Sequence, residues 1–281
     1  MSTVAEPETP EGPGDLWQRV ASGAVLAAAS LAAVWLGSWP FAMLVGAVAA
    51  IASWEWGRIV RGAGFDGYFG AQAVSVLLAT LLSTAGYAVP ASIGLVVVSI
   101  VLLVLRLRQK DQLTGLGVAA IGLPAVCLAL LRSDVLYGLE AVLFLFLVVW
   151  ATDIGGFVFG RTIGGPKLWP AVSPSKTWAG ALGGLLLAGI VGGVASQVLA
   201  SRDGLALVFV ALLLSLAAEM GDLAESALKR RFGLKDASRL IPGHGGVLDR
   251  IDGLMAAAAI ATVFAMLRNP LHPSMGLLFW P

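Results

Sequence analysis

The chain has 281 residues, of which 58% are hydrophobic and only 12% are charged. Soluble domains carry about 25% charged residues and about 45–50% apolar ones, so the composition excludes an ordinary water-soluble domain and favours a protein embedded in lipid. The net charge of +1 gives no reason to expect a nucleic-acid partner. The single cysteine, Cys127, excludes an intramolecular disulfide and a CxxC metal site.

Residues 1–18 are predicted to form a disordered, acidic N-terminal tail. The first fifteen residues contain proline, glycine and acids but no Lys or Arg. A signal peptide needs a basic segment before its apolar run, so we expect the first apolar run to remain as a membrane span.

Nine apolar runs follow the tail. A helix needs roughly 20 mostly apolar residues to cross about 30 Å of hydrocarbon. By this rule the spans are expected at residues 20–36, 39–56, 68–86, 88–105, 113–131, 136–158, 178–200, 204–220 and 251–267. The runs are continuous rather than alternating, which favours an all-α, polytopic helical bundle over a β-barrel.

The basic residues predict how these spans are oriented. If the N-terminus is cytoplasmic, fifteen of the eighteen Lys and Arg residues fall on the cytoplasmic side, and only Arg132, Arg202 and Arg268 fall outside. The positive-inside rule therefore supports nine spans with the C-terminus outside. We expect N-terminal transmembrane helices over residues 19–134 and a catalytic region over 135–281, with cytoplasmic loops at 159–177 and 221–250.

Residues 219–252 form the densest polar segment, with six of the seventeen acids and six of the eighteen bases. Glu219, Asp222 and Glu225 are spaced to share one face of a helix, and Asp249 and Asp252 lie three residues apart at the start of the ninth span. Acids at a membrane boundary are costly and are therefore functional candidates. Carboxylate oxygens from two helix ends suit Mg²⁺, so Asp222 and Asp249 are predicted metal ligands, with Asp252 beside them.

The bases of this segment predict a phosphorylated substrate. Lys229, Arg230 and Lys235 can neutralise phosphate oxygens. The turn at residues 242–246, Pro-Gly-His-Gly-Gly, would let backbone N–H groups approach an anion at a helix start. Two alternatives remain open: the Lys-Arg-Arg run can be a topology determinant or a contact to anionic lipid, and His244 can merely cap a helix.

A second polar segment covers residues 150–180. Asp153 lies in an apolar helix, where an acid is expensive without a partner. The run Ser-Pro-Ser-Lys-Thr at 173–177 is expected to open the seventh span, with Pro174 in its first turn. Lys176 and Thr177 could then bind nucleotide phosphates. Helix capping explains Thr177 equally well, whereas snorkelling explains Lys176 less well.

Residues 226–252 closely resemble the signature of the phosphatidate cytidylyltransferases, the CDP-diacylglycerol synthases. That pattern runs Ser, Lys-Arg, Lys-Asp, Pro-Gly-His-Gly-Gly and Asp-Arg-hydrophobic-Asp, and every position is present here. The segments around Asp153 and at 173–180 are similar to further elements of that family. The second departs from the family pattern, because Ser175 stands for a Lys and Ala179 for a Glu.

The resemblance implies a nine-span, dimeric enzyme of phospholipid biosynthesis in the inner (plasma) membrane, with its active site facing the cytoplasm. It would make CDP-diacylglycerol and pyrophosphate from CTP and phosphatidic acid. It would depend on Mg²⁺ and leave room for a second cation. The implied catalytic residues are Lys229, Arg230, Lys235, Asp236, His244 and Arg250; the substrate-binding residues are Asp153, Lys167, Ser173, Lys176, Thr177, Ser226, Gly245 and Gly246; the metal ligands are Asp222, Asp249 and Asp252.

Three other classes of membrane protein are alternatives. A CTP-dependent lipid kinase of the polyprenol or phytol type would use similar groups but release CDP. A CDP-alcohol phosphotransferase is disfavoured because its spaced Asp-Gly and Gly-x-x-x-Asp-x-x-x-Asp motif is absent from Asp252-Gly253 onwards. An ion-coupled transporter is disfavoured because the charges gather at one face and the sequence has no evident repeat.

Overall fold

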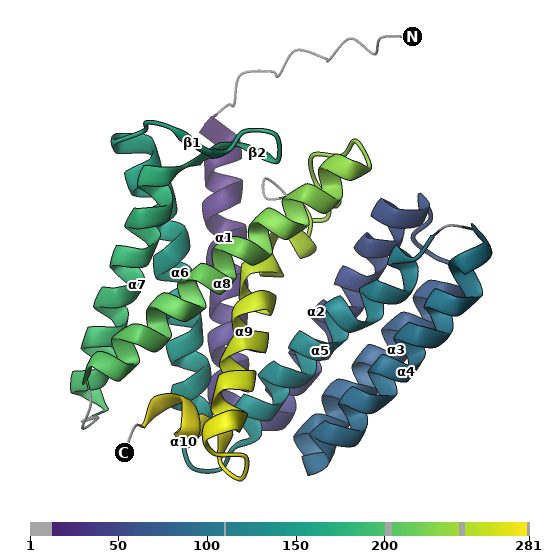
Figure 1. Ribbon diagram of the computed structural model, residues 1–281, viewed down its shortest axis with the longest axis horizontal. Coiled ribbons are helices and arrows are strands. Elements are labelled where there is room, and N and C mark those ends of the chain that lie inside the picture. Colours follow the sequence, from purple (N-terminus) through teal and green to yellow (C-terminus); the bar gives the residue numbers. More distant parts are fainter. Residues whose placement is uncertain (1–12, 110, 200–203, 242–244, 280–281) are drawn as a thin grey trace.

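The computed structural model describes residues 13–109, 111–199, 204–241 and 245–279. Within these residues the chain is built from long helices joined by short connections (Figure 1). The long helices are α1 (Pro13–Leu36), α2 (Ser38–Arg61), α3 (Gly67–Leu82), α4 (Ala88–Arg106), α5 (Leu113–Ser133), α6 (Gly138–Thr162), α7 (Trp178–Val198), α8 (Gly204–Arg231) and α9 (Leu248–Arg268). The short elements are η1 (Ser83–Tyr87), η2 (Leu107–Gln109), β1 (Lys167–Trp169), β2 (Ser173–Thr177) and α10 (Pro273–Leu278).

Seven helical stretches of the described chain are long and apolar enough to cross a membrane. One of them, Gly67–Gln109, contains both α3 and α4. The chain bends between them at Gly86, where φ is 94°, and the two helices then pack against each other. A shorter apolar helix, Ala21–Leu36, lies within α1. The predicted all-α, multi-span architecture is therefore confirmed at this level, with a small β-hairpin added to it.

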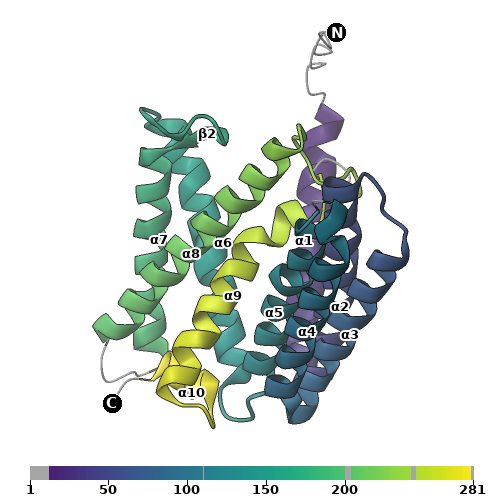
Figure 2. The same ribbon diagram turned by 45° about the vertical axis from the view of Figure 1, so that its right-hand side comes forward.

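The helices pack in two groups, with α1 between them (Figures 1 and 2). Helices α2 to α5 contact one another, as do α6 to α9, and α5 joins the groups by packing against α6 and α9. The buried core consists of aliphatic side chains such as Leu95, Ile121, Leu145 and Leu214, whereas large apolar side chains such as Leu182 cover the outer faces. Apolar outer faces are expected for helices whose solvent is lipid.

Glycines let α6 and α7 approach at backbone distance. A Cβ added to Gly155 would lie 2.4 Å from the carbonyl oxygen of Gly183, and one added to Gly180 would lie 2.7 Å from the carbonyl oxygen of Gly156. Small residues at such contacts are a common way for membrane helices to pack closely, because no hydrophobic driving force acts between helices in lipid. This contact fixes the end of α6 that carries Asp153.

Helix α8 runs obliquely across the bundle (Figures 1 and 2). Its 28 residues span about 42 Å at 1.5 Å per residue, more than a perpendicular crossing requires. It begins against α7, where a Cβ on Gly192 would lie 2.7 Å from the Leu207 carbonyl oxygen, and it ends beside the connection that leads to α9. The acids and bases of its last turns therefore lie between the two groups of helices.

The seventh span starts where its expected range, 178–200, begins, but the run before it is not the helical turn that was expected. Residues 173–177 form strand β2, antiparallel to β1, with Lys167 opposite Thr177 and Trp169 opposite Ser173. Pro174 is therefore not in a helical turn; a residue that precedes proline disfavours the helical region, and β1 offers a pairing partner. Helix α7 begins at Trp178, and its N-cap is Thr177, whose Oγ1 accepts a hydrogen bond from the Gly180 amide at 3.1 Å.

Two other expected segments are partly helical. Helix α1 begins at Pro13, inside the stretch expected to be a tail, and residues 1–12 lie outside the described residues. The expected loop 221–250 belongs to α8 up to Arg231 and to α9 from Leu248, which leaves residues 232–247 as the connection. The ion pair between Glu225 and Lys229, one turn apart, supports the extension of α8.

Candidate active site

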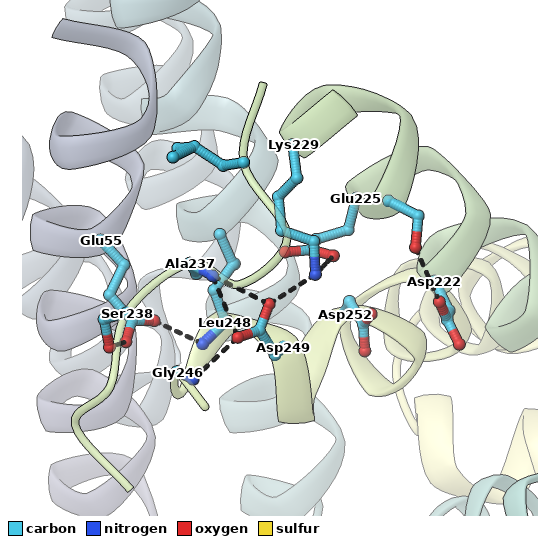
Figure 3. A network of polar contacts seen from close by, with 12 residues as sticks. Glu55, Asp222, Glu225, Lys229, Ala237, Ser238, Gly246, Leu248, Asp249 and Asp252 are labelled. Atoms are coloured by element: carbon cyan, nitrogen blue, oxygen red, sulfur yellow. Dashed lines mark hydrogen bonds and ion pairs between the residues drawn. The ribbon is translucent and has the colours of Figure 1, made fainter. Parts of the chain in front are cut away.

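The acids of α8 and α9 meet because the two helices approach each other closely at Gly221. A Cβ at this position would lie 2.6 Å from the carbonyl oxygen of Asp252 and 2.7 Å from Cβ of Ala256. Asp222 follows Gly221 directly, and Asp249 lies one turn before Asp252. Asp222 and Asp252 therefore lie near each other from two helices, whereas Asp249 points toward the connection that precedes α9 (Figure 3).

Asp249 is held by several hydrogen-bond donors at the start of α9 (Figure 3). Its carboxylate accepts hydrogen bonds from the amide of Gly246 at 2.7 Å and from the amide of Ala237 at 3.1 Å. It also accepts one from Nζ of Lys229 at 2.6 Å. Gly245 has φ of 82°, and a Cβ there would lie 2.9 Å from Oδ2 of Asp249, so the turn needs glycine at this position.

Lys229 connects the last turns of α8 to this carboxylate. Its ammonium group lies 2.5 Å from Oε2 of Glu225 and 2.6 Å from Oδ1 of Asp249. The three side chains are between 6% and 11% exposed, so this is a buried arrangement of one cation with two anions. Buried charges persist only when they are paired, and the two carboxylates fix the position of the ammonium group.

Asp222 links the two polar segments that the sequence analysis identified. Its Oδ2 lies 2.6 Å from Nζ of Lys176, which comes from strand β2. Its Oδ1 accepts a hydrogen bond from Oγ of Ser226, one turn further along α8, at 3.3 Å. The hairpin therefore delivers Lys176 to the α8 acids, a contact that no spacing in the sequence predicts.

Further carboxylates surround this contact. Asp153 on α6 lies within the electrostatic influence of Asp222, Lys176 and Arg250. Glu219 on α8 is influenced by Lys176, Asp222 and Asp153, and Asp252 by Asp222 and Asp153. Four acids, Asp153, Glu219, Asp222 and Asp252, thus lie close enough to influence one another, with Lys176, Lys229 and Arg250 among them.

A cavity of about 890 Å³ opens beside these groups. One part of its lining is polar and includes Asp153, Lys176, Asp222, Asp249 and Arg250. The other part is apolar and comes from α1, α2, α5, α6 and α9, with Leu26, Phe41, Val45, Ile121, Phe146 and Met255 among its side chains. The cavity can therefore accept a molecule that is charged at one end and hydrocarbon at the other.

The structure divides the predicted site residues into groups. Those lining the cavity are Asp153, Lys176, Thr177, Asp222, Asp249, Arg250 and Asp252. Ser226, Lys229, Gly245 and Gly246 contact these lining residues instead. Lys167, Lys235 and Asp236 are exposed, Ser173 is buried in the hairpin, and Arg230 bonds to the carbonyl oxygens of Val172 and Leu234. His244 lies outside the described residues.

Sequence reasoning missed Glu55, which lies on α2 and is fully buried. Its carboxylate accepts hydrogen bonds from Ser238, Val247 and Leu248 in the connection between α8 and α9 (Figure 3). A signal was available, because an acid inside a predicted span is a functional candidate by default.

The donors in the site fit a hard divalent cation. Asp222, Asp249 and Asp252 offer oxygen ligands only, which Mg²⁺ prefers. The described residues contain no group of three or more His, Cys, Asp or Glu side chains arranged so that it could hold a metal ion. Mg²⁺ does not require one, since it usually takes one or two carboxylates together with substrate phosphates and water.

Comparison with known proteins identifies the family. The model of the cytidylyltransferase family matches residues 17–267. A protein of Brucella suis biovar 1 named phosphatidate cytidylyltransferase is 39% identical over 264 residues, covering 92% of this chain and 97% of the relative. Proteins of the same name from Brucella abortus biovar 1 and Staphylococcus saprophyticus are 39% and 40% identical, covering 89% and 58% of this chain and 93% and 64% of their own lengths. The resemblance seen in the signature is confirmed, and the chain belongs to the cytidylyltransferase family.

Proposed function

We propose that this chain transfers CMP from CTP to phosphatidic acid, giving CDP-diacylglycerol and pyrophosphate. Membership of the family makes the chain a nucleotidyltransferase, and the name of its relatives, phosphatidate cytidylyltransferase, gives the substrate class. The observation that carries the proposal is the cavity, which joins a charged region to an apolar lining. The cations of that region, Lys176 and Arg250, suit the phosphate of a lipid and the phosphates of a nucleoside triphosphate.

The reaction needs positioning more than base catalysis. An oxygen of the lipid phosphate attacks the α-phosphorus of CTP, and the bond from that phosphorus to the oxygen bridging the β-phosphorus breaks, so pyrophosphate leaves. The second pKa of a phosphate monoester is about 6, so the nucleophile is already mostly dianionic near pH 7. The barrier therefore comes from charge repulsion and alignment, which cationic side chains reduce.

The bases of the site are assigned to the phosphates. Lys176 and Arg250 line the cavity and are placed to contact the triphosphate or the lipid phosphate, while Lys229 holds Asp249. Arg230 and Lys235, with Asp236 and His244, are proposed to act where the connection meets the substrates. Lys167, Ser173 and Thr177 are proposed to support the nucleotide side through the hairpin.

Mg²⁺ is the proposed cofactor, held by Asp222 and Asp249 with Asp252 close by. When bound, it would neutralise phosphate charge and stabilise the leaving pyrophosphate. Asp153 and Glu219 also line the cavity, and their oxygens would suit a second cation.

The proposed topology has nine spans, with a cytoplasmic N-terminus and the C-terminus outside. The asymmetry of the eighteen basic residues supports it. In this orientation the site faces the cytoplasm from the inner membrane, CTP arrives from water and phosphatidic acid enters from the bilayer. We also propose a homodimer, which the resemblance implies.

Pyrophosphate release by the purified protein tests the reaction. CTP, phosphatidic acid and Mg²⁺ are each omitted in turn, and release together with a CDP-lipid product is expected only when all three are present. A CTP-dependent lipid kinase would release CDP and no pyrophosphate. The variants D222N and D249N should lose about 100-fold or more of the turnover while remaining folded and extractable. Near-normal turnover in both variants would refute the metal assignment.

A further inference from the structure

Glu55 lies in the N-terminal half of the chain, on α2, far in sequence from the family signature. Its side chain is fully buried, and the carboxylate points toward the connection between α8 and α9 (Figure 3). A carboxylate buried in this way is stable only if donors satisfy it. The donors that it has are informative because they all belong to the catalytic half.

One carboxylate joins both ends of the connection. Oε1 of Glu55 accepts a hydrogen bond from Oγ of Ser238 at 2.5 Å and one from the amide of Val247 at 2.9 Å. Oε2 accepts a hydrogen bond from the amide of Leu248, the first residue of α9, at 2.6 Å. Glu55 therefore caps α9 from a different helix, where a helix N-terminus favours negative charge.

Glu55 and Asp249 bind neighbouring residues in the same two segments of the connection, 237–238 and 246–247. Asp249 accepts hydrogen bonds from the amides of Ala237 and Gly246, whereas Glu55 binds the next residue in each case, Ser238 and Val247. The two carboxylates thus clamp the connection from opposite sides. We call this arrangement, formed by Glu55, Asp249 and residues 237–238 and 246–248, the carboxylate clamp.

The clamp tolerates little displacement. A Cβ added to Gly246 would lie 2.6 Å from Oε1 of Glu55 and 3.0 Å from Cβ of Ala237. The Gly246 amide also donates a hydrogen bond to Asp249 at 2.7 Å. If Gly246 shifts away from Glu55, Asp249 therefore loses or weakens this hydrogen bond. The position of Asp249, and with it that of Lys229, therefore depends on α2.

We propose that Glu55 is a positioning residue for the reaction: from α2 it holds Ser238, Val247 and Leu248 so that Asp249 and Lys229 keep their places in the active site. It touches neither substrate nor cofactor and acts through the carboxylate clamp. The kinetic consequence rests on the proposed function, whereas the clamp itself can be tested without any turnover.

The main variant is E55Q, which keeps the size of the side chain but replaces one acceptor oxygen by an NH₂ donor. At least one of the Val247 and Leu248 amides then faces a donor. We expect kcat for CDP-lipid formation to fall about 10- to 100-fold, the range seen when residues supporting a metal site are changed, with KM for phosphatidate unchanged. Hydrogen exchange should speed up in peptides covering residues 232–249 and stay at the wild-type rate in α5 and α6.

E140Q is the matched control, because Glu140 lies in the first turn of α6, outside the cavity lining. It should leave both readouts unchanged. G246A is the second probe: it disturbs the same contact from the other side without altering any charge, and it should reproduce the local exchange and the fall in kcat. It also carries the test if E55Q cannot be extracted in folded form.

Wild-type kcat and wild-type exchange at residues 232–249 in either folded variant would overturn the proposal. A uniform rise of exchange in every helix would also overturn it, because Glu55 would then serve only global stability. If the wild-type protein makes no CDP-lipid, the proposed reaction fails, and the exchange measurements still decide whether Glu55 holds the connection.

Discussion

Replacing Lys229 by Met should destabilise the protein through the two carboxylates that it leaves behind. The ammonium group lies 2.5 and 2.6 Å from Glu225 and Asp249, and all three side chains are at most 11% exposed. At an effective dielectric constant of about 20, each attraction amounts to roughly 6 kcal/mol, much of which desolvation offsets. Breaking a buried pair by removing one partner costs about 3–5 kcal/mol in unfolding free energy, and we expect a loss of that size.

The double variant E225Q/K229M separates stability from chemistry. It removes one of the two uncompensated anions, while Asp249 keeps the amides of Ala237 and Gly246. We expect it to regain a large part of the lost unfolding free energy but none of the activity, because Lys229 is still missing. Unfolding in detergent can be followed by the fluorescence of the nine tryptophans.

An exposed lysine provides the control for this comparison. K167M changes a residue on β1 that is open to solvent, and its unfolding free energy should stay within about 0.5 kcal/mol of wild type. If K229M unfolds like the wild-type protein, or if E225Q/K229M is no more stable than K229M, the argument from buried charge is wrong.

Three other changes test different parts of the structure. K176A should raise KM for CTP about tenfold or more, measured by pyrophosphate release, because it removes a cation from the cavity; an unchanged KM would contradict its role. G221A should cost about 1–3 kcal/mol in unfolding free energy by forcing α8 from α9, whereas G94A, with open space around it, should not. Although burial opposes it, hydrogen bonds from Arg61 and the Phe69 amide hold the pKa of Asp66 below its usual value. The stability that Asp66 contributes is therefore present above pH ~4 and lost as the pH falls through its folded pKa, so D66N should flatten thermal stability measured against pH in this acid range.

Much of the fold follows from the sequence because a helix needs roughly 20 mostly apolar residues to cross the lipid. Each expected apolar run corresponds to one long helix of the described chain, and the bend at Gly86 falls between two of them. The hairpin was missed because Ser-Pro-Ser-Lys-Thr has the composition of a helix start. Strand β2 depends on pairing with Lys167–Trp169, a tertiary contact that a local pattern does not contain.

The site was predictable where its residues share one helix and not where packing joins distant segments. Asp222 and Ser226 lie one turn apart and do contact each other, as their spacing indicated. The approach of Lys176 to Asp222 depends on where the hairpin folds over α8. Glu55 was overlooked because it stands alone in an apolar run, and only the packing of α2 against the connection and the start of α9 gives it donors.

The carboxylate clamp also constrains the order of events during synthesis. Glu55 enters the membrane with α2, but the donors that satisfy it, Ser238 and Leu248, lie 183 and 193 residues further along the chain. Until the ribosome has made them, α2 carries an acid at the membrane boundary without these partners, and such a group is costly there. The contact between α2 and the start of α9 should therefore be completed only at the end of assembly, when α9 docks beside α2.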